Sequence, residues 1–217
     1  MLNVKMKADD PARLLAEGIE ALQLDIPTEV QAKLLDYVAL LAKWNRAYNL
    51  TAVRRPAQMV VRHLLDSLAV LPYLHGERVL DVGSGAGLPG IPLALASPRR
   101  HFTLLDSNGK KARFLVQAVA ALRLDNADVV QCRVADFHPD AGYSSIVSRA
   151  FSGMAELIDQ AAHLLAPDGR FLFMKGVYPQ AEVAALPAGW ELEAVHRLAV
   201  PGLDAERHLL VVRASAD

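Results

Sequence analysis

A cluster of glycines in the first half of the chain has the spacing of a nucleotide-binding loop. Gly83, Gly85, Gly87 and Gly90 follow a short apolar run that begins at Arg78. Glycine lets a backbone turn tightly between a strand and a helix and approach a ligand that a Cβ atom would block. Four glycines in this context predict a ligand-binding loop rather than a turn that only packs a helix on a strand. The segment from Gly85 to Gly90 also matches the dinucleotide template GxGxxG, so the motif alone does not identify the ligand.

Two carboxylates near these glycines narrow the choice of ligand. Asp81 lies at the carboxyl end of the strand beside the loop, where its charge would repel a pyrophosphate and attract the cationic methionyl part of S-adenosylmethionine. Asp106 ends the next predicted strand, a position from which a carboxylate can accept hydrogen bonds from both ribose hydroxyls. A helix cap for the stretch near Gly109 is the alternative role for Asp106. We therefore predict a site for S-adenosylmethionine that includes Asp81, Gly83, Gly85 and Asp106.

The remaining polar residues form no recognised metal or nucleophile motif. The seven histidines are scattered, with no close pair among themselves or with Cys132, and the sequence has no GxSxG segment. Zinc sites and covalent hydrolases usually show such spacings. We therefore expect neither a metal ion nor a covalent nucleophile.

Composition limits the class of protein. The chain has 217 residues, of which 53% are hydrophobic and 22% charged, as in an ordered globular protein with a substantial core. A single cysteine excludes an internal disulfide and suits a reducing compartment. There is no signal peptide and no run of ~20 apolar residues, so the expected location is the cytoplasm. The net charge of -1 argues against nucleic-acid binding over the whole surface.

Helical patterns precede Arg78, and strand-like and helix-like segments alternate after it. Apolar residues at helical spacing predict helices over 27–48, with Thr28 as the cap, and over 56–71, with proline at its start. Strands are expected over 78–83, 101–106, 127–132, 144–148, 170–175, 190–195 and 208–213. Later helices are expected over 110–124, 154–165 and 180–186, with a turn at Asp168-Gly169.

This order of segments predicts a Rossmann-like α/β fold with a mostly parallel, seven-stranded sheet. The last two strands have no room for a crossover helix between them and should form an antiparallel C-terminal edge. With a site for S-adenosylmethionine, this is the architecture of class I methyltransferases. We divide the chain into an N-terminal helical extension, residues 1–75, and an S-adenosylmethionine-binding domain, residues 76–217. The sequence does not fix the oligomeric state, for which a monomer is the default expectation.

Blocks of sequence along the chain form one recognisable set. They are WNRAYNLTAV at 44–53, VRHLLDSL at 61–68, the glycine loop at 81–92, LLDS at 104–107 with Gly109-Lys110, SRAF at 148–151, Lys175-Gly176 and ERH at 206–208. This set resembles the bacterial small-subunit ribosomal RNA guanine-N7 methyltransferases, also called glucose-inhibited division protein B. The glycine loop is shared by many methyltransferases, whereas the blocks at 44–53 and 61–68 are specific to this family. The resemblance covers nearly the whole chain from Leu34 on.

The resemblance implies a reaction and a set of site residues. The expected reaction transfers a methyl group from S-adenosylmethionine to N7 of the guanine commonly numbered 527 in 16S rRNA, free or in a small-subunit assembly intermediate. Donor contacts are expected at Gly83, Leu88, Val134, Ala135 and Arg149. The family usually has an acidic residue where Ala135 stands, so a backbone contact to adenine would survive here and a side-chain contact would not. The basic residues expected to matter for activity are Lys110, Arg133, Arg149 and Lys175.

Positive charge is concentrated between Lys43 and His63, where five basic residues and no acidic one give a local charge of +5. Solvated faces usually mix both signs, so we predict that this segment contacts RNA. The predicted RNA-binding residues are Arg54, Arg55, Arg62 and His63. For His63 and Asp66, one helical turn apart, spacing alone favours an exposed intrahelical pair, whereas the family resemblance implies a role on the RNA side or in domain packing. Trp44 and Tyr48 could stack on bases, although packing along a helix face is the favoured role for Trp44.

The expected chemistry needs positioning more than proton transfer. Guanine N7 carries a free lone pair, so the transfer requires no general base, and cationic groups near O6 would orient the guanine. Arg149 and Lys175 lie at or near the carboxyl ends of predicted strands, where ligands bind in open α/β sheets. The alternative for Arg149 is a pair with a carboxylate such as Asp81, which would organise the pocket.

Three other functions remain open from the sequence. A methyltransferase acting on a small molecule or a protein would share every donor-site residue. An NAD(P)-dependent oxidoreductase is disfavoured by Asp81 and by the lack of a catalytic Tyr/Lys or His/Arg set. The third is a non-catalytic RNA-binding protein with a relic pocket. Transfer of radiolabel from the donor to RNA would separate all four.

Overall fold

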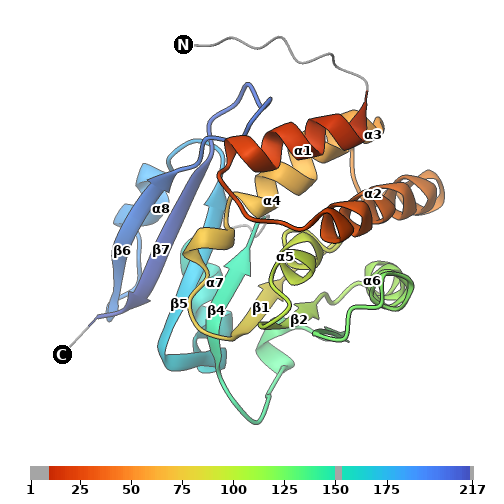
Figure 1. The fold of residues 1–217 in the computed structure, drawn as a ribbon. Helices are drawn as coiled ribbons and strands as arrows, with labels where there is room; N and C mark the ends of the chain where they lie inside the picture. The colour runs from red at the N-terminus through yellow and green to blue at the C-terminus, as the bar shows by residue number, and fades with distance from the viewer. Residues whose placement is uncertain (1–9, 150–152, 216–217) are drawn as a thin grey trace.

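A seven-stranded sheet forms the centre of the molecule, with the strand order β3-β2-β1-β4-β5-β7-β6 (Figure 1). The computed structural model describes residues 10–149 and 153–215. Strands β1 to β5 are parallel, and β7 is antiparallel to both β5 and β6, which confirms the predicted fold class. The strands are β1 (Arg78–Val82), β2 (His101–Leu105), β3 (Ala127–Val130), β4 (Tyr143–Ser148), β5 (Leu165–Lys175), β6 (Trp190–Arg197) and β7 (His208–Ala214).

Helices cover both faces of the sheet. The α-helices are α1 (Pro11–Ala21), α2 (Thr28–Tyr48), α3 (Pro56–Met59), α4 (Asp66–Leu68), α5 (Gly90–Ala96), α6 (Gly109–Leu122), α7 (Met154–Ala161) and α8 (Gln180–Ala184). A π-helical turn, η1 (Val60–Leu65), joins α3 to α4. The 3-10 turns are η2 (Leu71–Tyr73), η3 (Val134–Asp136) and η4 (Ala162–Leu164). In Figure 1, α1 to α6 gather on one side of the sheet.

The two sheet faces carry two hydrophobic clusters because side chains alternate along each strand. Val79 and Leu172 belong to the cluster that includes α1, α2, α5 and α6, whereas Leu80 and Phe171 belong to the cluster that includes α7. The strand order reverses between β1 and β4, which carry the chain to opposite halves of the sheet. In open α/β sheets, ligands bind at this point, outside the carboxyl ends of the strands.

The N-terminal helices differ from the prediction. Helix α1 was not predicted, although Asp10 caps it by accepting a hydrogen bond from the Ala12 N–H (3.0 Å). The predicted cap by Thr28 is wrong: Thr28 is the first residue of α2, and no side-chain cap bond is made there. The predicted helix over 56–71 is interrupted by the π-helical turn and ends at Leu68, with a separate 3-10 turn around Pro72.

Most later boundaries agree with the prediction within two residues, and β5 and α7 are the exceptions. It begins at Leu165 because this residue pairs with Tyr143 before the register shifts. Asp168-Gly169, predicted as a turn between elements, therefore lies within an irregular part of β5. Helix α7 ends at Ala161 and continues as a 3-10 turn rather than reaching residue 165.

The segment before residue 75 shares a hydrophobic core with the sheet. Leu34 and Leu65 lie in the same buried cluster as Val79, and the Tyr37 hydroxyl donates a 2.6 Å hydrogen bond to the Ala86 carbonyl oxygen. The division at 75 follows the change from helices to sheet, and the two-domain assignment stays a prediction. Residues 1–9 of the predicted extension and residues 150–151 of the SRAF block lie outside the described residues. No helix in the described part of the chain is long and apolar enough to cross a bilayer.

Candidate active site

The glycine loop leaves β1 at the carboxyl edge of the sheet and leads into α5. Gly83 has a φ of 69°, and a Cβ added there would meet no atom within 4 Å, so its backbone faces open space. Its N–H donates to the Leu105 carbonyl oxygen (2.8 Å), which ties the loop to β2. At Gly90 a Cβ would lie 2.6 Å from Asp81 Oδ2, so this close approach requires glycine. The loop exposes bare backbone at Gly83 and packs tightly at Gly90.

Asp106 is buried at the end of β2 and binds the backbone of the glycine loop. Its Oδ2 accepts from the Gly85 N–H (2.9 Å), and its Oδ1 accepts from the Asn108 N–H (2.8 Å). The cap of α6 is Asn108, whose side chain accepts from the Lys110 N–H (2.9 Å), so Asp106 does not have the alternative capping role. Each carboxylate oxygen has two lone pairs, which leaves one on each free to accept from a diol.

Asp81 is fully buried beneath the loop. Its Oδ2 accepts from the Gly90 N–H (2.9 Å), whereas its Oδ1 has no hydrogen-bond partner among the described residues. Burial raises the pKa of this carboxyl to about 7. Its direct contact with a cationic donor stays a prediction.

A cavity of about 660 Å³ lies along the carboxyl ends of β1, β2 and β3, and we name it the glycine-loop cavity. It is lined by Val82, Gly83, Leu105, Asp106, Ser107, Lys111, Cys132, Arg133, Val134, Ala135 and Gln160. A buried carboxylate, bare glycine backbone and apolar side chains suit a ribose and a flat heterocycle. The residues present therefore fit a nucleoside donor. Of the predicted donor residues, Asp81, Gly85, Leu88 and Arg149 do not line this cavity, and Leu88 is buried.

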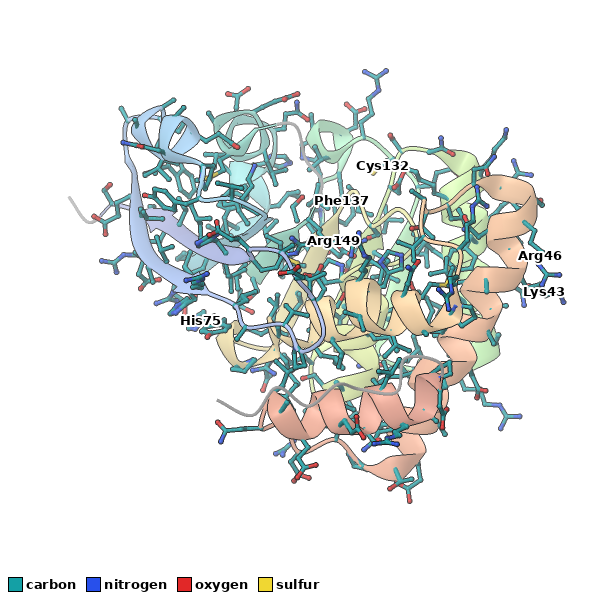
Figure 2. The ribbon with its side chains drawn as sticks, turned by 90° about the horizontal axis from the view of Figure 1, so that it is seen from above. Lys43, Arg46, His75, Cys132, Phe137 and Arg149 are labelled. Carbon is teal, nitrogen blue, oxygen red and sulfur yellow. The ribbon has the colours of Figure 1, made fainter. Side chains whose placement is uncertain are left out.

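A second cavity, of about 330 Å³, lies along the carboxyl ends of β4 and β5 and the start of β7. We name it the arginine cavity. It is lined by Val53, Arg62, His63, Asp66, Arg149, Met174, Lys175, Gly176 and Arg207. Arg149 lies near the centre of the molecule in Figure 2, whereas Lys43 and Arg46 project from the outer side of α2. The sheet therefore brings Arg149 and Lys175 together with Arg62 and His63 from the N-terminal segment.

Asp66 holds two arginines of this cavity. Its side chain is 3% exposed, and its Oδ1 accepts from Arg207 Nε at 2.7 Å. Its Oδ2 lies 3.5 Å from an Arg149 guanidinium nitrogen, which also donates to the Arg62 carbonyl oxygen (3.4 Å). The alternative of an exposed pair between His63 and Asp66 is therefore wrong, because both are buried. The carboxylate partner of Arg149 is Asp66 rather than Asp81.

His63 is fixed in one neutral form by its neighbours. Its Nδ1–H donates to the Arg62 carbonyl oxygen (2.9 Å), because a carbonyl can only accept. Its Nε2 therefore accepts from the Thr51 hydroxyl (2.8 Å). Burial, with a smaller contribution from the charge of Arg149, lowers the pKa of His63 to about 4. The imidazole is neutral near pH 7, and both ring nitrogens are in use.

The block at 44–53 positions Thr51 for this contact. The buried Asn45 amide donates to the carbonyl oxygens of Thr51 (2.9 Å) and Val53 (3.2 Å) and accepts from the Thr51 N–H (2.9 Å). Trp44 packs against Phe114 with ring centroids 5.7 Å apart, which confirms its predicted packing role. The sequence blocks specific to the family thus build one wall of the arginine cavity.

Other predicted site residues are held by structural contacts or lie apart. Lys175 Nζ donates to both carboxylate oxygens of Glu182 (2.9 and 2.8 Å). Arg54 donates to the Asn45 carbonyl oxygen (3.1 Å) and to Asn49 Oδ1 (2.9 Å) at the end of α2. Arg55 and Lys110 are exposed and line neither cavity. No cluster of His, Cys, Asp and Glu that could hold a metal ion occurs in residues 10–149 and 153–215.

Arg207 lines the arginine cavity, although it is not among the site residues predicted from the sequence. It lies directly before β7 in the ERH block, and the position alone gave no role. The sequence offered one signal, an arginine in a block that contributes to the family resemblance and directly precedes a predicted strand. Its partner Asp66 is 141 residues away, so the pair is visible only in the fold.

Solved structures define the class of fold. The mitomycin 7-O-methyltransferase MmcR aligns with a TM-score of 0.61 and 16% identity over 74% of this chain and 56% of that one. The glycopeptide N-methyltransferase MtfA, solved with S-adenosyl-L-methionine, aligns with a TM-score of 0.57 and 15% identity over 71% of this chain and 88% of that one. The fold is that of class I methyltransferases.

Sequence comparison then gives the family. The family model described as "GidB: rRNA small subunit methyltransferase G" matches residues 30–210. A relative from Marinobacter nauticus named "Ribosomal RNA small subunit methyltransferase G" is 55% identical, with 91% of this chain and 92% of the relative covered. One of the same name from Xanthomonas oryzae pv. oryzae is 50% identical, with 98% of this chain and 99% of the relative covered. The chain belongs to the rRNA small subunit methyltransferase G family.

Proposed function

We propose that this protein transfers a methyl group from S-adenosylmethionine to N7 of the guanine commonly numbered 527 in 16S rRNA. One observation carries the proposal. The glycine-loop cavity, which suits a nucleoside, and the arginine cavity, which is lined by basic side chains, lie along neighbouring strand ends of one sheet. The names of the relatives support a small-subunit rRNA substrate. The choice of guanine N7 rests on the resemblance of the sequence blocks.

The glycine-loop cavity is the proposed donor site. Asp106 would accept hydrogen bonds from the ribose, and the open backbone at Gly83 would let the donor approach. Val134 and the backbone of Ala135 would contact the adenine. Gly85 would act by holding Asp106 in place, and Leu88 by packing beneath the loop. When bound, S-adenosylmethionine supplies a methyl group on a cationic sulfur.

The arginine cavity is the proposed site of the target guanine. Arg149 and Arg207 are each held by Asp66 at one side of the guanidinium, which leaves other N–H donors for guanine O6 or a phosphate. Lys175, anchored by Glu182, adds a further positive charge. Holding N7 close to the methyl carbon and in line with it can supply about 7–11 kcal/mol of the barrier.

His63 is proposed as a structural wall residue rather than a base. Both its ring nitrogens are occupied, and guanine N7 has no proton to remove. The single-turnover rate with saturating RNA is therefore expected to stay level from near-neutral to mildly alkaline pH. A rise with a slope of one through that range would contradict this and would require a base.

The RNA is proposed to approach from the basic side of the N-terminal segment. Arg62 and His63 line the arginine cavity, and Arg54 and Arg55 precede the helix that carries them. Lys110 and Arg133 offer further phosphate contacts on the side of the glycine-loop cavity. Ribosomal RNA as substrate would place the reaction in the cytoplasm.

The test is methyl transfer from radiolabelled S-adenosylmethionine to free 16S rRNA, to small-subunit assembly intermediates and to mature small subunits that lack the modification. Digestion of the product to nucleosides should yield labelled 7-methylguanosine, which primer extension should map to position 527. Label in another nucleoside would overturn the choice of guanine N7. Label only in protein or in small molecules would overturn the RNA substrate.

A further inference from the structure

The segment after β5 exposes two apolar side chains beside the arginine cavity. Gly176, which lines the cavity, is followed by Val177 and Tyr178, which are 74% and 39% exposed. Val177 is the most exposed large hydrophobic side chain among the described residues. Apolar side chains gathered at one exposed place often mark a binding surface. Neither the donor site nor the guanine site uses these two residues.

Tyr178 is held in position by the first residue of β7. Its ring meets the His208 ring edge to face, with centroids 6.1 Å apart and planes at 67°. His208 Nδ1–H in turn donates to the Gly176 carbonyl oxygen (2.8 Å), so the loop is tied to β7 beside Arg207. An aromatic ring that is already oriented loses little side-chain freedom when it binds a flat partner.

The surroundings of Tyr178 indicate the chemistry of that partner. The adjoining cavity carries Arg62, Arg149, Lys175 and Arg207, of which Asp66 and Glu182 neutralise only part. Cations next to an exposed aromatic ring are the combination that binds single-stranded nucleic acid, with phosphates on the charges and a base on the ring. Tyr178 lies two residues after Gly176, which lines the cavity, and its ring contacts His208, which directly follows Arg207, so this ring lies next to the proposed guanine site.

We propose that Tyr178, held by His208 at the rim of the arginine cavity, is a stacking platform for an unpaired RNA base next to the target guanine. This inference rests on the proposed function and adds to it that a neighbouring base must be free to leave its own stack. The ring, rather than the phenol hydroxyl, makes the contact.

The test combines a protein change with an RNA change. Binding of a single-stranded oligoribonucleotide centred on one guanine is measured by fluorescence anisotropy, with S-adenosylhomocysteine present. Tyr178→Ala should weaken binding by about 5- to 150-fold, the range found for loss of one base stack, whereas Tyr178→Phe should bind like the wild type. Oligonucleotides with an abasic site at each of the two positions on either side of the guanine are then compared.

With the abasic site at one of these positions, the affinity of the wild type should fall by the same factor that Tyr178→Ala loses with the intact oligonucleotide. The affinity of Tyr178→Ala should not fall further with that abasic oligonucleotide. The platform would be overturned if Tyr178→Ala bound every abasic oligonucleotide more weakly than the wild type by the same factor. It would also be overturned if Tyr178→Ala bound the intact oligonucleotide as tightly as the wild type. Val195→Ala is the matched control, because Val195 is also exposed, at 40%, but lies on β6 and lines neither cavity. An equal loss in this control would likewise overturn the assignment to Tyr178.

Failure of the platform and failure of the proposed function are distinguishable. If an abasic position weakens binding by the wild type and not by Tyr178→Ala, but the wild type does not methylate 16S rRNA, the proposed reaction is overturned and the platform is kept. If the wild type methylates the guanine but no abasic position distinguishes it from Tyr178→Ala, the proposed reaction is kept and the platform is overturned. Titration calorimetry with S-adenosylhomocysteine should give the same affinity for Tyr178→Ala as for the wild type.

Discussion

The two cavities at the carboxyl edge of the sheet are built in different ways. The glycine-loop cavity depends on backbone groups and one buried carboxylate, in contacts such as Gly85 to Asp106 that join neighbouring strands. The arginine cavity depends on long charged side chains, in contacts such as Asp66 to Arg207 that join the two ends of the chain. One half of the site is therefore fixed by local backbone geometry and the other by charge pairing across the fold. Substitutions should therefore affect the two halves separately.

The largest expected effect is that of Asp66→Ala on stability. Removing this buried carboxylate leaves Arg149 and Arg207 close together without a counter-charge, and they are only 25% and 24% exposed. The free energy of unfolding should fall by about 3 kcal/mol, the lower end for a broken buried pair, because both arginines keep some contact with water. Urea unfolding measures it.

Asp168→Ala is the control for this change, since its pair with His75 is exposed. The control should change the free energy of unfolding by less than about 1 kcal/mol. Affinity for S-adenosylhomocysteine should be kept by folded Asp66→Ala protein. If Asp66→Ala is no more destabilising than the control, the arginine cavity does not depend on charge pairing.

Next in size is the effect of Asp106→Ala on donor binding. The loss of hydrogen bonds to a charged group, each contributing about 1.5–3 kcal/mol, should weaken the affinity for S-adenosylhomocysteine by at least about tenfold. Titration calorimetry measures it, with the exposed Asp136→Ala of the nearby η3 as the control. RNA affinity should be unchanged, and NAD should not bind the wild type. Tighter binding of NAD than of S-adenosylhomocysteine would show that the cavity is not a methyl-donor site.

The two halves should also respond to pH with opposite signs. Burial raises the pKa of Asp81 from 3.8 to about 7, so the folded state binds the extra proton and the free energy of unfolding falls as pH rises between these values. Burial lowers the pKa of His63 from 6.5 to about 4, so the unfolded state binds the extra proton and the free energy of unfolding rises with pH between these values. Both slopes act between about pH 4 and 6.5. In the wild type they should therefore largely cancel between about pH 4.5 and 6.

Single variants should reveal each slope. Asp81→Asn should leave the histidine slope, so that stability rises with pH by up to about 1.4 kcal/mol per pH unit. His63→Gln should leave the opposite slope. Urea unfolding at pH 4.5, 5.25 and 6 checks both, and parallel curves for wild type and variants would show that neither group is perturbed as described.

The smallest expected effect concerns RNA phosphates. The double reversal Arg54→Glu and Arg55→Glu should weaken RNA binding, and each lost contact should lower the slope of log affinity against log salt by about 0.7–0.9. Because Arg54 also binds the end of α2, the double change Lys43→Gln and Arg46→Gln serves as a comparison that disturbs no such contact. These two residues point away from the centre of the molecule, and the salt slope should stay unchanged (Figure 2).

Donor affinity should not change in either double variant. An unchanged slope in both would show that the basic segment is structural. The RNA would then have to be held by Lys110, Arg133 and Lys175 on the sheet side alone.

The sequence was sufficient for the fold class and for the glycine loop because both depend on local patterns. Alternating strands and helices predicted the sheet, and glycines before a helix, with Asp106 on the next strand, predicted a cavity there. Helix α1 was within reach as well, since Asp10-Pro11 and the apolar spacing of Leu14, Leu15 and Ile19 form a helix start followed by one buried face.

The arginine cavity was only partly predictable because its contacts join distant residues. Arg149 and Lys175 followed from their places after strands, but nothing in the order of residues indicates that Asp66 is buried against Arg207. Charge alone also predicted a single role, contact with RNA, for the whole basic segment between Lys43 and His63. The structure separates Arg54, which binds the end of α2, from Arg62, which lines a cavity. The π-helical turn that carries Arg62 and His63 has no pattern that distinguishes it from an α-helix in sequence.

The place of β7 in the sheet has a consequence for protein synthesis. This strand is the last in sequence of the described elements, yet it lies between β5 and β6, and Arg207 directly precedes it. A chain emerging from the ribosome can pack its N-terminal helices against β1 to β4 early, because structure forms from the N-terminus as synthesis proceeds. Asp66 can pair with Arg207 only after β7 has inserted between β5 and β6. The arginine cavity therefore cannot be completed until residues 207–214 have been synthesised and β7 has paired with β5.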